Sequence, residues 1–355
     1  MDQADGLRQA ILVLGMHRSG TSALTRVISL CGADLPATLM PPAVGDNETG
    51  FWEPQALVDL HDEVLAAMGS SWRDVRGMPA DWFDSAAAVP FRERLAALLV
   101  AEYRDAAVFV VKDPRLCRLL PLWLPVLAGL GVVPRVVVPV RHPLEVAASL
   151  HRREGFDAGR AQALWRSHVL AAERESRGLA RCFVTYDQLM TDWRAVVRRI
   201  GALAGADWLA RAEADAIEAF LSADLRHHAL GGAHGEAAAM IAGVAPVFDW
   251  LVAAAAGAEP DRAVLDRVAA EVAIGEAYFG PVIGPIEAAL ARQAGELQHW
   301  IDAAVERYAV IEDLRREIDR LAAPVPAAPR ARWKRWVGAL RRRESAAGGR
   351  GDGEG

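Results

Sequence analysis

Residues 11–24 read ILVLGMHRSGTSAL, an apolar run that leads through a glycine-bounded loop into helix-forming residues. Gly15 and Gly20 have the spacing of the phosphate-binding loop G-x-x-x-x-G-K-[ST], but Thr21 stands where that loop has its lysine. A strand, a glycine-rich loop and a helix N-terminus together form a cradle for an anion. The stretch therefore predicts an α/β fold with an anion site after the first strand, and Arg18 is the permanent cation of its loop.

Short apolar runs rich in β-branched residues recur along the first 235 residues. They are continuous rather than alternating, which is typical of strands that are buried on both faces. The expected strands are 10–15, 108–112, 135–141 and 182–186. Helical patterns separate them, at 22–31, 54–68, 90–104, 144–152, 158–177 and 188–204. Strands that alternate with helices predict a three-layer domain with a parallel sheet over 1–235.

Composition limits the classes of function. The 355 residues carry a formal net charge of −6, which gives no support for nucleic-acid binding. The three cysteines are far apart and show no pairing or metal-ligand spacing, so we expect a reducing, cytoplasmic setting. The uncharged segment 119–134 contains several prolines and glycines and is shorter than the roughly 20 residues of a membrane span. It predicts a buried helix, a turn and a strand.

The pattern changes after residue 235. We expect an Ala-rich helical extension over 236–284 and a long helix over 285–322. Apolar residues in that helix follow 4-3 spacing, at Leu290, Ala294, Leu297, Ile301, Ala304, Tyr308 and Ile311. Such spacing predicts a coiled coil that pairs with a second copy or with another protein. The alternative is a helix that lies on its own domain.

Residues 323–355 are expected to be a linker and a basic, partly disordered tail. The last 26 residues carry eight Lys/Arg against three Asp/Glu. Within 330–343, Trp333, Trp336 and Leu340 fall on one helical face among basic residues. A helix of this kind suits an anionic membrane surface, here the inner face of the membrane. The alternative is a solvated tail whose tryptophans dock on the body of the protein.

The segment MHRSGTSAL resembles the 5′-phosphosulfate loop of the sulfotransferases, which reads approximately P-[KR]-[ST]-G-T-[TS]. The donor in that family is 3′-phosphoadenosine 5′-phosphosulfate (PAPS), and no metal is required. The resemblance implies a phosphate-loop sulfotransferase fold in which the loop wraps the 5′-phosphosulfate through Arg18, Ser19, Gly20, Thr21 and Ser22.

Two further segments are similar to that family. Arg141 ends an expected strand and Ser149 follows in the next helix, a spacing that resembles the family's 3′-phosphate site. The segment FVTYDQL (183–189) looks like the stretch whose tyrosine meets the adenine, which would be Tyr186. GFWEP (50–54) and KDPRLCRLLPLW (112–123) are most similar to bacterial members that modify carbohydrates. The resemblance therefore implies a carbohydrate or glycolipid acceptor.

Sulfuryl transfer requires a base for the acceptor hydroxyl and cations for the developing charge. Lys112, at the end of an expected strand, is the candidate second cation. Glu53 is the first candidate base and His61 the second. In the family, a basic segment covers the donor, and Arg226, His227 and His228 lie where it would come. A phosphate-loop kinase or hydrolase and a non-catalytic scaffold of the same fold remain the alternatives.

Overall fold

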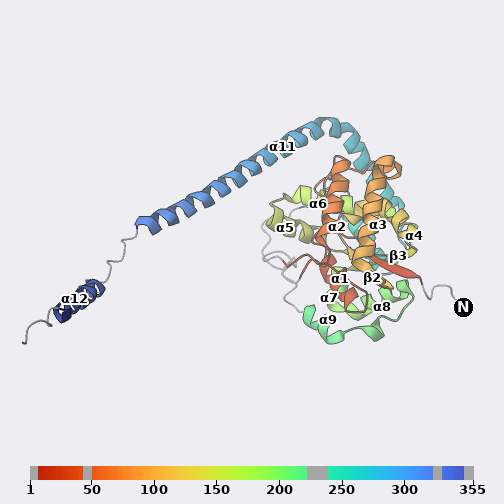
Figure 1. Ribbon diagram of the computed structural model, residues 1–355. Helices are drawn as coiled ribbons and strands as arrows, with labels where there is room; N and C mark the ends of the chain where they lie inside the picture. Colours follow the sequence, from red (N-terminus) through yellow and green to blue (C-terminus); the bar gives the residue numbers. More distant parts are fainter. Residues whose placement is uncertain (1–6, 43–49, 222–238, 323–329, 348–355) are drawn as a thin grey trace, which may run out of the picture. The chain divides into compact units, whose positions relative to one another are not determined.

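The computed structural model describes residues 7–42, 50–221, 239–322 and 330–347. The chain divides into two compact units, Met1–Tyr278 and Phe279–Gly355. The first unit is an α/β domain in which helices cover both faces of a sheet (Figure 1). Its strands are β1 (Arg8–Val13), β2 (Val108–Lys112), β3 (Val132–Val140) and β4 (Arg181–Thr185). The helices that precede β4 in the sequence are α1 (Thr21–Ser29), α2 (Gln55–Ala67), α3 (Val89–Tyr103), α4 (Leu116–Gly129), α5 (Pro143–Glu154) and α6 (Ala158–Glu175). After β4 come α7 (Tyr186–Thr191), α8 (Trp193–Ala204), α9 (Ala214–Phe220) and α10 (Val244–Ala255).

The four strands are parallel and lie in the order β2-β1-β3-β4. The expected parallel sheet is therefore confirmed, and its strand boundaries shift by a few residues. β3 begins at Val132 rather than at residue 135, because Val132 pairs with Arg8 at the start of β1. At the other end of β1, Val13 pairs with Lys112 and with Val137. β1 and β2 thus end side by side, and β3 continues three residues further, to Val140.

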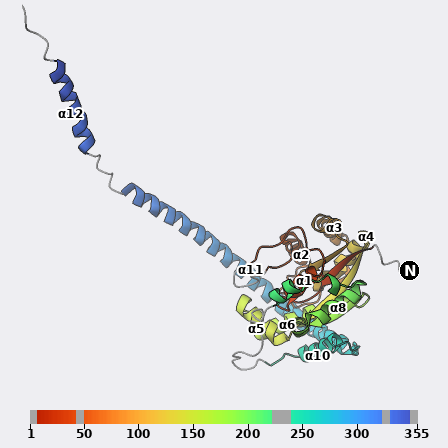
Figure 2. The same cartoon turned by 90° about the horizontal axis from the view of Figure 1, so that it is seen from below.

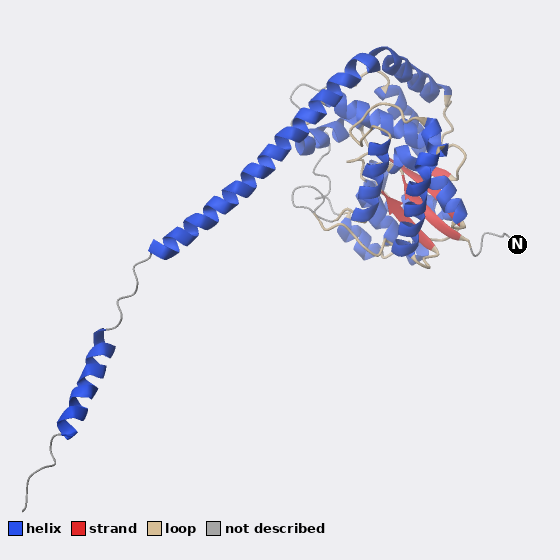
Figure 3. Cartoon of the chain, turned by 45° about the horizontal axis from the view of Figure 1, so that its top comes forward, coloured by secondary structure: helices blue, strands red, loops and turns tan. Residues whose placement is uncertain are grey.

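Alternate residues of each strand enter two separate hydrophobic layers. Ala10 and Leu12 pack in a layer with α2, α3, α4 and α6, whereas Ile11 and Val13 pack in a layer with α1 and α8. Figures 2 and 3 show these helices on either side of the strands. Because both faces are covered, the strands read as continuous apolar runs.

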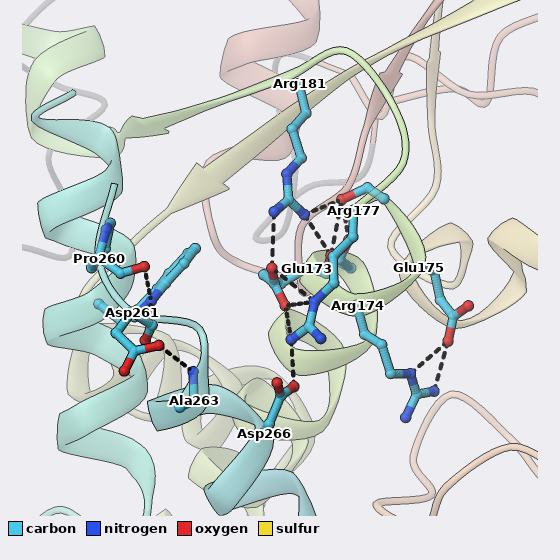
Figure 4. Close-up of polar contacts among 12 residues, drawn as sticks. Glu173, Arg174, Glu175, Arg177, Arg181, Pro260, Asp261, Ala263 and Asp266 are labelled. Atoms are coloured by element: carbon cyan, nitrogen blue, oxygen red, sulfur yellow. Dashed lines mark hydrogen bonds and ion pairs between the residues drawn. The ribbon is translucent and has the colours of Figure 1, made fainter. Parts of the chain in front are cut away.

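The segment after residue 238 contributes to the core of the first unit. Trp250 of α10 packs edge-on against Phe183 of β4, with ring centroids 5.6 Å apart. The first turns of α11 (Ala263–Ala322) are tied to α6, because Arg177 forms ion pairs with both Glu173 and Asp266 (Figure 4). Glu173 is buried and also accepts from Arg181, so two guanidinium groups compensate its charge.

The second unit contains the rest of α11 and α12 (Arg330–Ala347). The expected long helix is present, but it starts at Ala263 rather than at residue 285 and continues through Pro281 and Pro285. The side chains around these prolines are exposed, so water can satisfy the carbonyl groups that lose a helical donor. The apolar residues of the 4-3 stripe are also exposed, for example Leu297 at 62% and Tyr308 at 62%. No described helix is both long and apolar enough to cross a membrane.

Candidate active site at the carboxyl edge of the sheet

The expected site residues meet at one edge of the sheet. Parallel strands place their carboxyl ends together, and ligands of open α/β sheets bind there. The loop 14–20 leaves β1 at this edge, Lys112 ends β2, Arg141 follows β3 and Tyr186 follows β4. Residues that are far apart in the sequence are therefore brought to one place by the topology alone.

Close packing explains both glycines of the loop. A Cβ on Gly15 would lie 2.6 Å from Cγ of Pro139 in β3 and 2.8 Å from Cγ2 of Thr21. A Cβ on Gly20 would collide with the ring of Tyr186, and Gly20 also has a φ of 81°. The loop is therefore held tightly against β3 on one side and Tyr186 on the other, and α1 begins directly after it at Thr21.

Two arginines and a serine converge beside this loop. Arg18 donates from Nε to Oγ of Ser149 in α5 at 2.8 Å, across 131 positions of sequence. Arg141 donates to the carbonyl oxygen of Arg18 at 3.1 Å and forms an ion pair of 2.8 Å with Glu145. Arg18 was expected at the 5′-phosphosulfate and Ser149 at the 3′-phosphate. In the structure the two side chains contact each other, so residues expected at the two anion positions adjoin.

Tyr186 completes this group. It is the first residue of α7, and its backbone is fixed by a capping box in which Thr185 and Gln188 exchange hydrogen bonds. Its ring lies against Gly20, and the guanidinium of Arg141 stands 4.5 Å from the ring centroid. The arrangement presents an aromatic ring next to a permanent cation.

Glu53 and Lys112 form a buried ion pair at the end of β2. The Lys112 ammonium lies 2.9 Å from Oε2 of Glu53, and both side chains are almost entirely buried. Burial raises the pKa of Glu53 to about 7, although Lys112 opposes the shift. A carboxyl group with such a pKa can accept a proton near neutral pH.

His61 has a different environment from the one expected of a base. Its Nδ1 lies 2.8 Å from Oδ2 of Asp113, and Trp123 donates from Nε1 to its Nε2 at 2.9 Å. The indole N–H can only donate, so Nε2 is the acceptor and a neutral ring carries its proton on Nδ1. His61 is fully buried on the apolar face of α2, and both of its nitrogens are engaged within the protein.

Asp113 and Arg115 extend this network; the motif KDPR predicted that Arg115 would either face the acceptor or pair with an acid, whereas Asp113 was not identified as a site residue. Arg115 donates to Oδ1 of Asp113 through its backbone N–H at 2.9 Å and through Nη1 at 3.1 Å. Burial opposes the ionisation of Asp113, but Arg115 and His61 outweigh it and hold the pKa of Asp113 well below its usual range. The sequence offered one sign of this, since KDPR places both charged residues directly after a buried strand.

Trp72 is a further neighbour of the loop that the sequence analysis missed. Its ring centroid lies 4.5 Å from that of His17. Nε2 of His17 and Oγ of Ser19 are buried and have no hydrogen-bond partner among the described residues. Thr21 is buried, whereas Ser22 is half-buried in the first turn of α1. The loop thus carries polar atoms that can still be satisfied by a ligand.

Metal-ligand groups, cavities and the segment expected to cover the donor complete the description of the site. In the described part of the chain, no three His, Cys, Asp or Glu residues are grouped as metal ligands. Two cavities, of about 270 and 410 Å³, lie away from the loop, beside Arg118 and beside Arg199. The segment with Arg226, His227 and His228 lies outside the described residues.

Comparisons with known proteins give a likeness to solved structures, but none to a family model or a curated sequence. A solved structure, described as a sulfotransferase domain from the curacin biosynthetic pathway, is similar at 16% sequence identity with a TM-score of 0.36. The match covers 57% of this chain and 75% of that one. Because the TM-score is so low, this likeness carries no argument about function, which is inferred instead from the residues of the site.

Proposed function

We propose that this protein is a sulfotransferase that moves the sulfuryl group of PAPS to an acceptor hydroxyl on a carbohydrate or glycolipid. The observation that carries the proposal is the convergence of Arg18, Arg141 and Ser149 beside a glycine-bounded loop. The guanidinium of Arg141 and the hydroxyl of Ser149 suit the terminal 3′-phosphate, which distinguishes PAPS from ATP, and Arg18 connects them to the loop. This agrees with the resemblance of the loop to the sulfotransferases.

The remaining parts of the donor have matching residues. The backbone N–H groups at the start of α1 would hold the 5′-phosphosulfate together with Arg18, Ser19, Gly20, Thr21 and Ser22. Tyr186 would meet the adenine, next to the cationic group of Arg141. Lys112 ends the strand that pairs with β1, so its cation adjoins the loop.

The Glu53–Lys112 pair supports in-line transfer without a metal. The acceptor oxygen attacks sulfur, the bond from sulfur to the 5′-phosphate oxygen breaks, and the electron pair leaves with the bisphosphate. The Glu53 carboxylate takes the hydroxyl proton, which neutralises it. A neutral Glu53 no longer compensates Lys112, so the ammonium charge becomes available to the leaving oxygen. Proton uptake and charge stabilisation are thus coupled in one buried pair.

The network around Asp113 argues against a phosphate-loop kinase or hydrolase. Such enzymes hold Mg²⁺ with an Asp that ends a strand near the loop. Here, Asp113 accepts from His61 on one oxygen and from Arg115 on the other. Both oxygens are therefore engaged within the protein. In the proposal, His61 positions Asp113 and does not transfer the proton, which leaves Glu53 as the base.

Nucleotide selectivity tests the proposal. Isothermal titration calorimetry would compare adenosine 3′,5′-bisphosphate with ADP and ATP, each with and without Mg²⁺. We expect the bisphosphate to bind at least about tenfold more tightly, because it alone engages the second anion position. Preference for ATP with Mg²⁺ would refute the proposal in favour of a kinase or hydrolase. Bisphosphate binding without sulfate transfer from labelled PAPS to any cell-envelope glycan would instead favour the non-catalytic scaffold.

We also propose where the protein acts. Its three cysteines are free, and Cys31 and Cys117 are buried, which supports a reducing, cytoplasmic setting. Trp333 and Trp336 of α12 are exposed and stack obliquely, with ring centroids 5.9 Å apart. Two exposed tryptophans on a basic helix suit the inner, anionic face of a membrane, where a glycolipid acceptor would be found.

The exposed stripe of α11 supports self-association. We propose that residues 285–322 pair in parallel with a second copy. Ile301 and Tyr308 occupy equivalent positions of successive heptads, and parallel pairing there brings Arg307 of one copy close to Glu312 of the other, so opposite charges meet. Within one chain, Glu312 is bonded to Arg315 on the helix surface, an exposed pair that the second copy can rearrange.

A further inference from the structure

Aromatic rings and arginines gather next to the donor loop. Trp72 lies between His17 of the loop and Phe156, whose ring centroid is 5.9 Å away. The guanidinium carbons of Arg73 and Arg153 stand 5.2 and 5.8 Å from the Trp72 ring centroid. Trp72, Phe156, Arg73, Arg153 and Arg160 are called the Trp72 cluster below.

The exposed charged groups of the Trp72 cluster are mainly arginines. Arg73 and Arg153 share one carboxylate, that of Glu154, at 2.7 and 2.8 Å. Glu154 is largely covered, with 15% of its side chain exposed, whereas Arg73 is 51% exposed. Arg160 stands 4.7 Å from the Phe156 ring centroid, and its side chain is exposed. The acid next to it, Asp157, accepts from the backbone N–H of Arg160 at the start of α6.

Helix α5 connects this cluster to the proposed donor site. Ser149, in the middle of the helix, accepts from Arg18, and Arg153 lies one turn further toward the C-terminus. Burial, followed by the charges of Arg115 and Arg153, holds the pKa of His17 well below its usual range, so the imidazole is neutral. Its buried Nε2 has no partner among the described residues. The loop therefore offers a neutral hydrogen-bonding atom on the side of the cluster.

We propose that the Trp72 cluster binds the acceptor and selects an acidic carbohydrate, one that carries a carboxylate or sulfate close to the hydroxyl that reacts. The half-buried Trp72 provides an apolar surface for a sugar ring. Arg73, Arg153 and Arg160 pair with the acidic group, for which a planar guanidinium fork is well suited. This inference rests on the proposed function and adds the charge of the acceptor to it.

The first experiment compares two acceptors that differ in one charge. A uronate-containing oligosaccharide and its carboxyl-reduced, neutral counterpart are titrated into the full-length protein by calorimetry, and both are then assayed for sulfate transfer. We expect the acidic form to bind about tenfold more tightly, an advantage that shrinks at high salt. Equal or tighter binding of the neutral form would overturn the inference, whether or not sulfate is transferred.

The second experiment assigns this preference to the arginines. In the double variant Arg153→Gln and Arg160→Gln, KM for the acidic acceptor should rise about tenfold, while kcat and the affinity for adenosine 3′,5′-bisphosphate stay unchanged. Arg174→Gln is the matched control, because Arg174 pairs with Glu175 on α6 outside the cluster. An equal loss for both acceptors would contradict the inference. If the protein binds the acidic acceptor through these arginines but transfers no sulfate, the proposed function fails and the acceptor site stands.

Discussion

Ser149→Ala separates recognition of the 3′-phosphate from the rest of nucleotide binding. The hydroxyl accepts from Nε of Arg18 at 2.8 Å and retains its own proton to donate to a phosphate oxygen. The variant removes both functions at a position that is 2% exposed and in the middle of α5. Alanine is a strong helix former, so we expect the helix to remain intact.

The size of the effect follows from the type of bond. A hydrogen bond that involves a charged group contributes about 1.5–3 kcal/mol, which corresponds to roughly 10- to 150-fold in Kd. Adenosine 3′,5′-bisphosphate should weaken by this factor in the Ser149→Ala variant. Adenosine 5′-phosphate lacks the second phosphate and should be little affected. The ratio of the two dissociation constants is therefore the informative quantity.

Calorimetric titration of both nucleotides measures this ratio. Ser85→Ala is a suitable control, because it removes a hydroxyl that bonds to a backbone carbonyl, that of Trp82, between two 3₁₀ turns. Urea unfolding of each variant checks that the fold is unchanged. The reasoning is refuted if the two nucleotides weaken by the same factor, since Ser149 would then only support the loop through Arg18.

Three further predictions concern the base, the buried histidine and the long helix. Glu53→Gln should lower kcat by about 10²–10⁴-fold. The activity of the wild type should rise with pH through about 7, because only the carboxylate form of Glu53 accepts a proton. The variant should lack this rise. An unchanged pH profile in the variant would exclude Glu53 as the base. His61→Ala leaves the buried Asp113 without one partner, so the free energy of unfolding in urea should fall by about 2–5 kcal/mol, and an unchanged midpoint would contradict this. Ile301→Asp should convert a dimer into a monomer in light scattering, whereas Asp302→Ala should not; a wild-type monomer would end the proposal of self-association.

Lys112 needs a different test from Glu53. Removing the lysine leaves the Glu53 carboxylate buried without its partner, which typically costs about 3–5 kcal/mol of stability. A loss of activity in Lys112→Ala would therefore combine a catalytic effect with partial unfolding. The isosteric Glu53→Gln change keeps a hydrogen-bonding group beside Lys112 and is the clearer experiment.

The sequence was informative where local pattern decides the structure. The continuous apolar runs predicted all four strands, since each strand is covered on both faces. Gly15 and Gly20 marked a tight loop, and the structure gives the reason in Pro139 and Tyr186. Because the strands are parallel, Lys112, Arg141 and Tyr186 all lie at the carboxyl edge of the sheet. Their proximity is a consequence of topology rather than of any single residue. Their roles in donor binding stay predictions.

Long-range pairing was not predictable in the same way. The bond from Arg18 to Ser149 joins positions 131 apart, and no periodicity indicates the rotamer of an arginine. Glu53 and Lys112 were identified separately as base and cation, but their pairing depends on how the segment before α2 packs against β2. His61 occupies an apolar position of α2. Its buried partners are Asp113, directly after β2, and Trp123 on α4, and sequence spacing does not indicate that they meet.

The contact between Gly15 and Pro139 limits how the sequence can change over time. A side chain at position 15 would push against the Pro139 ring and the methyl group of Thr21. Pro139 lies two residues before Arg141, so a shift of β3 would also displace the guanidinium that holds Arg18. Among homologous chains, positions 15 and 139 should therefore vary together, with a larger residue at one allowed only when the other becomes smaller. Such covariation would report on the spacing between the loop and β3 independently of any enzymatic assay.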